Sequence, residues 1–296
     1  VGLEAIQPER RDRLSAPRAA VAGITMDRPR IMVILNTTPD SFSDGGRHRG
    51  AAQAVCHAAR MAKAGAALVD VGGESTRPGA EPVPEEAEIA RVEPVIAALR
   101  DEMQTPVSID TRKSAVARAA VAAGAVMVND VSGFTFDSRL APFCADQGLP
   151  VCVMHAQGVP QTMQDNPRYD NVLLDVFDFL DAQVGFLEDV GISRDRIIVD
   201  PGIGFGKTQA HNLALLHNLS LFHGLGCLIL VGASRKGFIG RISGAAEASE
   251  RMPGSVALAL HAAMQGAHIL RVHDVAETVQ ALAVWQAVTK GEHDGS

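Results

Sequence analysis

Four polar residues that follow separate apolar runs of the sequence are Asp110, Asn129, Asp200 and Lys236. Together they offer two carboxylates, an amide that both donates and accepts, and a cationic donor. Such a set suits a flat, neutral, nitrogen-rich heterocycle, because a guanidine-like edge forms paired hydrogen bonds with a carboxylate. The simpler interpretation of Lys236 is a salt bridge to Asp200 alone.

A second group of residues is cationic. Arg77, Arg271 and His273 occur with loops rich in Gly, Ser and Thr, and such side chains and backbone amides bind phosphate or pyrophosphate. Arg271 lies inside an apolar run, so a buried ion pair is the alternative explanation for it. Since neither this ion pair nor a Lys236–Asp200 salt bridge accounts for both groups, we expect a site with a heterocycle-binding end and an anion-binding end.

The glycine-rich run GIGFGK at residues 202–207 superficially resembles a phosphate-binding loop. It lacks the four-residue spacing of a Walker A motif, so we do not interpret it as a nucleotide site. The glycines are expected to form tight turns that allow close approach of a ligand, with Phe205 presented to that ligand.

Eight short apolar runs predict the strands that position these residues. They are near-continuously apolar rather than alternating, which is typical of strands buried on both faces of a parallel sheet. The runs are 31–35, 67–71, 107–109, 126–128, 151–154, 197–199, 228–231 and 268–272. Ala-rich amphipathic segments of helical length lie between them, clearly at 50–64, 84–101, 113–123, 171–190, 209–222, 254–265 and 275–289.

Eight strand–helix units in 296 residues predict an α/β fold, a single (β/α)8 TIM barrel. A doubly wound open sheet is the alternative, but no GxGxxG fingerprint follows the first strand. In a barrel the carboxyl ends of all strands meet at one mouth, so polar residues after every strand predict one site. Caps of the following helices also explain Asp130 and Asp274.

The composition excludes several classes of protein. A net charge of −7, from 27 basic and 34 acidic residues, argues against a broad surface for nucleic acid or an anionic membrane. No apolar run approaches the roughly 18 residues of a membrane span. The 4 cysteines show no CxxC or zinc spacing, which favours small buried side chains in a reducing compartment and therefore a cytoplasmic protein.

The sequence predicts a single domain, because no composition shift or linker divides it. We expect the barrel to span residues 26–290, between a loosely ordered, flexible extension at 1–25 and a frayed tail at 291–296. The N-terminal stretch is charged and lacks the hydrophobic segment of a secretory signal.

Eight motifs at the predicted strand ends closely resemble those of dihydropteroate synthases, in order, from about residue 31 to 283. They are ILNTTPDSFSDGG (34–46), DVGGESTRPGA (70–80), SIDTRK (108–113), VND (128–130), VMHAQGVPQTMQ (153–164), DPGIGFGKT (200–208), VGASRKGFIG (231–240) and RVHDVAET (271–278). The resemblance implies a transferase of folate biosynthesis. Such an enzyme condenses 6-hydroxymethyl-7,8-dihydropterin pyrophosphate with p-aminobenzoate, giving 7,8-dihydropteroate and pyrophosphate.

The resemblance also implies roles for residues at the strand ends. The pterin would be held by Asp110, Asn129, Met154, Asp200 and Lys236. Arg271 and His273 would grip the pyrophosphate, Asn36 would bind a Mg²⁺ cofactor carried by it, and Ser234 would be a further substrate-binding residue.

Residues of the first two loops would close over the reacting centre, namely Phe42, Asp44, Thr76, Arg77 and Pro78. Phe205 would help to hold the aminobenzoate ring. The catalytic residues implied are Asp44, Thr76, Arg77, Lys236, Arg271 and His273.

The sequence departs from the family at Gly237, where many members have Ser. A contact of this position with aminobenzoate or a sulfonamide would therefore come from the backbone. The resemblance implies a homodimer, formed through late helices. Three alternatives remain at this point: a pterin-dependent methyltransferase, a non-catalytic pterin-binding subunit, and an unrelated barrel for sugar phosphates.

Overall fold

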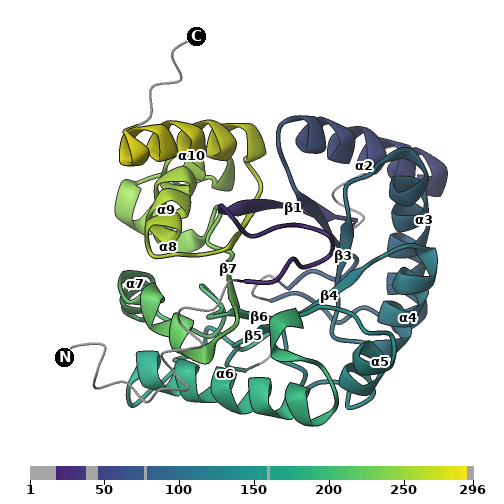
Figure 1. The fold of residues 1–296 in the computed structure, drawn as a ribbon, viewed down its shortest axis with the longest axis horizontal. Helices are drawn as coiled ribbons and strands as arrows, with labels where there is room; N and C mark the ends of the chain where they lie inside the picture. The colour runs from purple at the N-terminus through teal and green to yellow at the C-terminus, as the bar shows by residue number, and fades with distance from the viewer. Residues whose placement is uncertain (1–17, 38–45, 77–78, 159–160, 292–296) are drawn as a thin grey trace.

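The fold is a closed barrel of eight parallel strands. The computed structural model describes residues 18–37, 46–76, 79–158 and 161–291. Each strand pairs with its neighbours in chain order, and the eighth pairs with the first. Figure 1 shows the strands at the centre with the helices in a ring around them. The predicted (β/α)8 barrel is confirmed.

The strands are short, as the eight apolar runs predicted. They are β1 (Arg30–Asn36), β2 (Leu68–Gly72), β3 (Val107–Asp110), β4 (Met127–Asp130), β5 (Val151–Met154), β6 (Ile197–Asp200), β7 (Leu228–Val231) and β8 (Ile269–Val272). Each predicted run overlaps one strand, with boundaries within two residues.

The helices pack outside the strands. The α-helices are α2 (Gly46–Lys63), α3 (Glu85–Glu102), α4 (Ser114–Ala123), α5 (Leu140–Asp146), α6 (Val172–Asp189), α7 (Gln209–His217), α8 (Gly237–Ser243), α9 (Met252–Met264) and α10 (Val275–Lys290). The 3₁₀ helices of the described residues are η3 (Arg194–Arg196), η4 (Leu219–Leu225) and η5 (Ala248–Arg251). In the described part of the chain, no helix combines the length and the apolar character that a membrane crossing requires.

The helix predicted over 209–222 is wrong at its C-terminal end. Helix α7 ends at His217, and Asn218 leaves the helical conformation at φ −112°, ψ 27° before η4 begins. The short helices α5 and α8 were not among the clear predicted cases. Each has only seven residues, too few for a helical repeat of apolar positions to be recognised.

Alternate residues of each strand point to opposite sides of the barrel wall. One set packs against the helices, and it includes Val33, Val69 and Ile109. The other set fills the barrel interior near its base, including Met32, Leu68, Met127, Cys152, Ile198 and Ile269. Two residues further along, four of these strands carry polar interior side chains, namely Asp70, Asn129, Asp200 and Arg271, while Ile34 and Met154 stay apolar. The barrel interior is therefore apolar at its base and polar at its mouth.

The chain before β1 covers the base of the barrel. Residues 18–25 of this segment belong to the extension that was predicted to be flexible. Val21 within it is nevertheless buried and forms an antiparallel bridge with Ile24. Arg30 fixes this segment through Thr25 and an ion pair with Asp27. In Figure 1 the purple segment crosses the barrel opening. The described part of the expected extension is therefore packed against the barrel.

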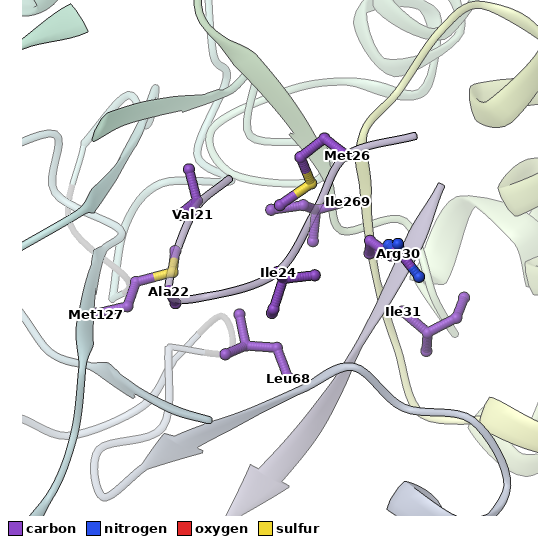
Figure 2. A pocket seen from close by; sticks show the side chains of 9 residues that line it. All are labelled: Val21, Ala22, Ile24, Met26, Arg30, Ile31, Leu68, Met127 and Ile269. Carbon is purple, nitrogen blue, oxygen red and sulfur yellow. The ribbon is translucent and has the colours of Figure 1, made fainter. Parts of the chain in front are cut away.

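A small hollow lies between this segment and the starts of the strands. Figure 2 shows that apolar side chains line most of it, and that Arg30 is its one charged side chain. Because Arg30 is already paired, the hollow offers no converging polar groups to a ligand. The polar residues singled out in the sequence lie at the opposite end of the barrel.

Candidate active site

Arg271 occupies the centre of the polar mouth. It points inward from β8 and donates from Nε to Asp70 Oδ2 and from Nη2 to Asp110 Oδ2, both at 2.7 Å. The buried ion pair that was the alternative explanation for Arg271 therefore exists. It does not exclude a binding role, because both partners also lie at the mouth.

Asp70 is a central residue that the sequence analysis did not single out. It is fully buried in β2, and its Oδ2 atom also accepts from Asn129 Nδ2 at 3.0 Å. Among the described residues, its Oδ1 atom has no hydrogen-bond partner. A charged residue inside the apolar run ALVDV was the available signal, the same signal that drew attention to Arg271. Asp70 links the arginine to the amide of the predicted heterocycle site.

Asn36 and Asp110 approach each other across Gly72. The register of β1, β2 and β3 aligns Asn36 with Gly72 and Gly72 with Asp110. A Cβ atom at Gly72 would lie 3.7 Å from Asn36 Oδ1 and 3.8 Å from Asp110 Oδ2. The missing side chain therefore leaves the predicted metal-binding amide beside a predicted substrate carboxylate.

Asp200 reaches the same mouth from β6. Its Oδ2 atom and the Arg271 side chain both lie 3.9 Å from the position of a Cβ at Gly232. Its Oδ1 atom accepts from the Gly202 amide at 2.7 Å. Met154, next to Asp200 in the register of β5 and β6, is buried at the same level. The structure thus brings Asp110, Asn129, Met154, Asp200 and Arg271 together.

Lys236 enters the mouth from the end of the loop after β7. Its ammonium lies 4.0 Å from the centre of the Phe205 ring, a cation–π contact. No ion pair joins it to a carboxylate of the described residues, so the simple Lys236–Asp200 salt bridge is not found. The preceding residue, Arg235, has a left-handed backbone at φ 57° and pairs with Asp274. This turn directs Lys236 toward Phe205.

Ser234 sets the hydrogen bonding of His273. The Ser234 hydroxyl oxygen accepts from the His273 amide at 3.2 Å and lies 3.0 Å from His273 Nδ1. Burial, with Arg235 and Arg271 nearby, lowers the pKa of His273 to about 4, so its ring is neutral at pH 7. When the hydroxyl donates to Nδ1, the ring carries its proton on Nε2 and can donate it to a ligand.

The charges at the mouth shift one another's pKa values. Burial raises the pKa of Asp200 to about 6, against the opposing effect of Lys236 and Arg271. Burial also raises the pKa of Asp110, which the Arg271 guanidinium opposes. Burial lowers the pKa of Lys236 to about 8. For Arg271, burial acts to lower the pKa, but Asp70 and Asp110 outweigh it and the arginine stays charged.

An ion-pair network supports the segment that follows β2. Lys113 donates to Glu74 Oε1 at 3.0 Å, to Glu88 Oε2 at 2.6 Å and to the carbonyl of Val83 at 2.6 Å. The amide of Val83 donates to Glu74 Oε1 at 2.8 Å. Residues 74 and 83 are thereby tied together. Thr76, predicted to be catalytic, lies between them and is half-buried.

The remaining sequence predictions divide into two kinds. Phe42, Asp44, Arg77 and Pro78 lie outside the described residues. Asp130 faces away from the barrel interior and accepts hydrogen bonds from the amides of residues 132 and 134. Its role is structural, but the predicted helix caps are not found: α5 begins only at Leu140, and Asp274 makes no side-chain cap hydrogen bond to α10.

The donor set fits a metal ion that arrives with a substrate. Within residues 18–37, 46–76, 79–158 and 161–291, no three His, Cys, Asp or Glu side chains are placed to hold a metal. Mg²⁺ commonly binds one or two protein oxygens together with substrate phosphates and water. The Asn36 amide oxygen, at the mouth beside Asp110, can be such a protein ligand.

Lys207 is the second important residue that sequence reasoning missed. It belongs to the GIGFGK run but is buried, and it bonds to His155 and to the Phe205 carbonyl. It is turned away from solvent, so it is not the lysine of an open phosphate loop. The sequence carried no sign of this burial, because Lys207 lies in a glycine-rich loop outside the apolar runs.

Comparison with known proteins gives one consistent family. Residues 32–273 match the family model described as pterin binding enzyme. The chain is 46% identical over 271 residues to dihydropteroate synthase of Escherichia coli K12, covering 92% of this chain and 95% of the relative.

Solved structures agree with the sequence relatives. One is dihydropteroate synthase of Xanthomonas albilineans with 4-aminobenzoic acid, at 48% identity and a TM-score of 0.86, covering 93% of this chain and 99% of that one. Another is the enzyme of the same organism in complex with 7,8-dihydropteroate, at 46% identity and a TM-score of 0.83, covering 92% and 99%.

Proposed function

Since the chain belongs to the pterin-binding enzymes, and among them to the dihydropteroate synthases, we propose that its mouth holds a pterin pyrophosphate against p-aminobenzoate. The enzyme condenses 6-hydroxymethyl-7,8-dihydropterin pyrophosphate with p-aminobenzoate to 7,8-dihydropteroate and pyrophosphate. The observation that carries this function is the convergence of Asp110, Asn129 and Asp200 with Arg271 at one end of the barrel. The matched relatives are synthases, which favours condensation over methyl transfer.

The carboxylates and the amide bind the pterin. Asp110 and Asp200 supply acceptors for the N–H groups of the pterin, and Asn129 supplies both a donor and an acceptor. Lys236 donates to a ring acceptor from its place over Phe205. Met154 offers an apolar contact to the ring face. The apolar floor below these residues keeps water away from the hydrogen bonds.

The cationic side stabilises the leaving group. The carbon–oxygen bond between the pterin methylene and pyrophosphate breaks, the amine nitrogen bonds to that carbon, and the amine loses a proton. Arg271 and the Nε2–H of His273 donate to the departing oxygens, where negative charge develops. The amine of p-aminobenzoate is already neutral at pH 7, so the site positions it rather than deprotonating it.

Mg²⁺ bound through Asn36 would neutralise charge on the pyrophosphate. Residues 42, 44, 77 and 78 are proposed to complete the site over the reacting carbon, with Thr76, because a cation formed there would otherwise react with water.

We further propose a cytoplasmic homodimer. Three cysteines, Cys144, Cys152 and Cys227, are buried, as small apolar side chains of a protein in a reducing compartment often are. Met264, Val284 and Val288 on α9 and α10 are 67%, 61% and 76% exposed, which supports an interface through late helices. Light scattering of the purified protein tests the dimer.

The test of the catalytic function is release of pyrophosphate. Purified protein is mixed with both substrates and Mg²⁺, and pyrophosphate and dihydropteroate are quantified together. Equal amounts of the two products are expected. Pyrophosphate release that does not depend on p-aminobenzoate would indicate hydrolysis and contradict the proposal, and binding without turnover would indicate a non-catalytic pterin-binding protein.

A further inference from the structure

Lys207 is a buried cation whose contacts the condensation reaction does not explain. It lies in the segment 201–208 between β6 and α7, and the residue is only 2% exposed. Its ammonium lies 2.8 Å from His155 Nδ1, 3.2 Å from the His155 carbonyl oxygen and 3.0 Å from the Phe205 carbonyl oxygen. No carboxylate of the described residues forms an ion pair with it.

These three contacts match the three donors of an ammonium group. Burial lowers the pKa of His155 to about 3, so the ring is neutral and Nδ1 can accept. Burial lowers the pKa of Lys207 to about 7, while the carboxylate of Asp200 opposes the change. Burying a charge among neutral acceptors costs folding free energy. Packing alone therefore does not explain why a lysine occupies this position.

The contacts join two loops at the mouth. His155 begins the loop after β5, and Phe205 belongs to the loop after β6. The backbone of the second loop has other supports: Asn212 binds the Gly204 amide, and Tyr169 binds the Gly206 carbonyl. In the described structure the Phe205 carbonyl is bound by Lys207. Lys207 is therefore the side chain that fixes the residue carrying the ring.

The loop after β6 packs tightly against the loop after β5. A Cβ atom at Gly202 would lie 1.9 Å from the His155 carbonyl oxygen, and one at Gly206 would lie 2.2 Å from the Gln157 carbonyl oxygen. The two loops are thus in close backbone contact. Lys207 bonds across this contact, from the loop after β6 to His155.

We propose that Lys207 is a positioning residue of the reaction: it fixes the Phe205 ring, and through that ring the ammonium of Lys236, against the bound substrates. The proposal rests on the proposed function, because the substrates are those of the condensation. Lys207 itself touches neither substrate. Its effect is transmitted from the Phe205 carbonyl to the Phe205 ring and then to Lys236.

The test compares Lys207→Met with a matched control, Lys63→Met. Lys63 is exposed on α2, away from the mouth. Lys207→Met is expected to raise the KM for p-aminobenzoate about tenfold, a change equal to about 1.4 kcal/mol. The Kd for the pterin substrate, measured by calorimetry, is expected to change less, because Asp110, Asn129 and Asp200 are held by strands. Lys63→Met is expected to leave both constants at the wild-type values.

A purely structural role would give a different result. Lys207→Met would then lower the thermal unfolding temperature without changing the KM of the folded enzyme, and this outcome would overturn the proposal. If Lys207→Met is insoluble, Lys207→Gln, which keeps an N–H donor, is measured in the same way. A smaller rise in the same KM is expected, and an unchanged KM would again overturn the proposal.

The reaction of the wild-type protein distinguishes a failure of the proposed function from a failure of the positioning role. A wild-type protein that releases no pyrophosphate contradicts the proposed function itself. A wild-type protein that turns over normally, beside a Lys207 variant with unchanged kinetic constants, contradicts only the positioning role.

Discussion

Arg271 Nη2 lies 2.7 Å from Asp110 Oδ2, so the cation expected to meet the pyrophosphate is already paired with a carboxylate expected to hold the pterin. The two ends of the site are therefore one electrostatic unit. A pterin bound to Asp110, as proposed, would redistribute the hydrogen bonds of that carboxylate and so change the donor capacity of Arg271. We expect substitutions in this unit to affect stability and catalysis together.

Asp70→Asn is expected to destabilise the fold. Asp70 accepts from both Arg271 and Asn129, and loss of its charge leaves a buried arginine with one carboxylate instead of two. The free energy of unfolding should fall by about 3 kcal/mol, the scale of breaking a buried ion pair. Urea denaturation measures the change. Asp101→Asn is the control, since Asp101 is 64% exposed in a surface pair and its loss should have little effect.

Arg271→Met is expected to slow the chemical step. Removal of one preorganised donor to the developing charge should raise the barrier by about 3 kcal/mol, on the order of a hundredfold in kcat. Single-turnover release of pyrophosphate measures it, and circular dichroism checks that the variant is folded. A folded Arg271→Met enzyme with the wild-type rate would show that the pyrophosphate is bound elsewhere.

Lys236→Met is expected to weaken pterin binding. The variant keeps a side chain of similar length over Phe205 but removes the charge and the donors. The hydrogen bond proposed between Lys236 and the pterin ring would be charge-assisted, so the Kd for the pterin should rise on the order of tenfold or more. Calorimetry with the pterin measures this directly. Equal pterin affinities of wild type and variant would remove Lys236 from the heterocycle site.

Asp200 predicts a pH dependence of pterin binding. Burial raises its pKa to about 6 in the free protein, and the ligand N–H groups require the carboxylate. Below pH 6 the free protein therefore holds a proton that binding must release, and the affinity should fall about tenfold per pH unit. Calorimetry between pH 5 and 8 in several buffers measures the affinity and the proton release. Asp200→Asn should bind weakly, with a flatter profile; an unchanged profile would assign the titration to another group.

The proposed Mg²⁺ role predicts a reversible loss of activity. A chelator should stop turnover, and added Mg²⁺ should restore it. Asn36→Ala should raise the Mg²⁺ concentration needed for half-maximal activity more than it changes the unfolding temperature, because its side chain lies at the mouth beside Asp110. Full activity in the presence of excess chelator would rule out a metal ion in the reaction.

The sequence was sufficient for the barrel, because buried parallel strands leave apolar runs that can be counted. It was also sufficient for residues at the exits of the strands, such as Asp110, Asn129 and Asp200. Asp70 was missed because it lies inside its run, two positions before Gly72, and not at the exit of the strand; the charge within an apolar run and the alternation of interior and exterior positions were the signals that could have identified it. Applying that alternation to β2 would have placed it beside Arg271.

Other contacts could not be read from the sequence. Lys207 looks like a loop lysine, and its burial depends on how the loops after β5 and β6 pack together. The pairing of Ser234 with His273 depends on how the segments after β7 and β8 pack together, and Arg235 beside it has a left-handed backbone, a conformation that an arginine rarely adopts. These features arise from tertiary packing, for which local patterns carry no signal.

The base of the barrel is filled by Met32, Leu68 and Met127, whereas charged side chains lie at its mouth. The barrel interior is therefore closed at its base. In the described part of the chain, the apolar base separates the mouth from water on that side, so a reactant bound at the mouth would face solvent past the ends of the strands. The electrophilic carbon of a substrate bound there must be protected from water on the side of the mouth. How well the mouth is covered is therefore expected to govern the ratio of condensation to hydrolysis.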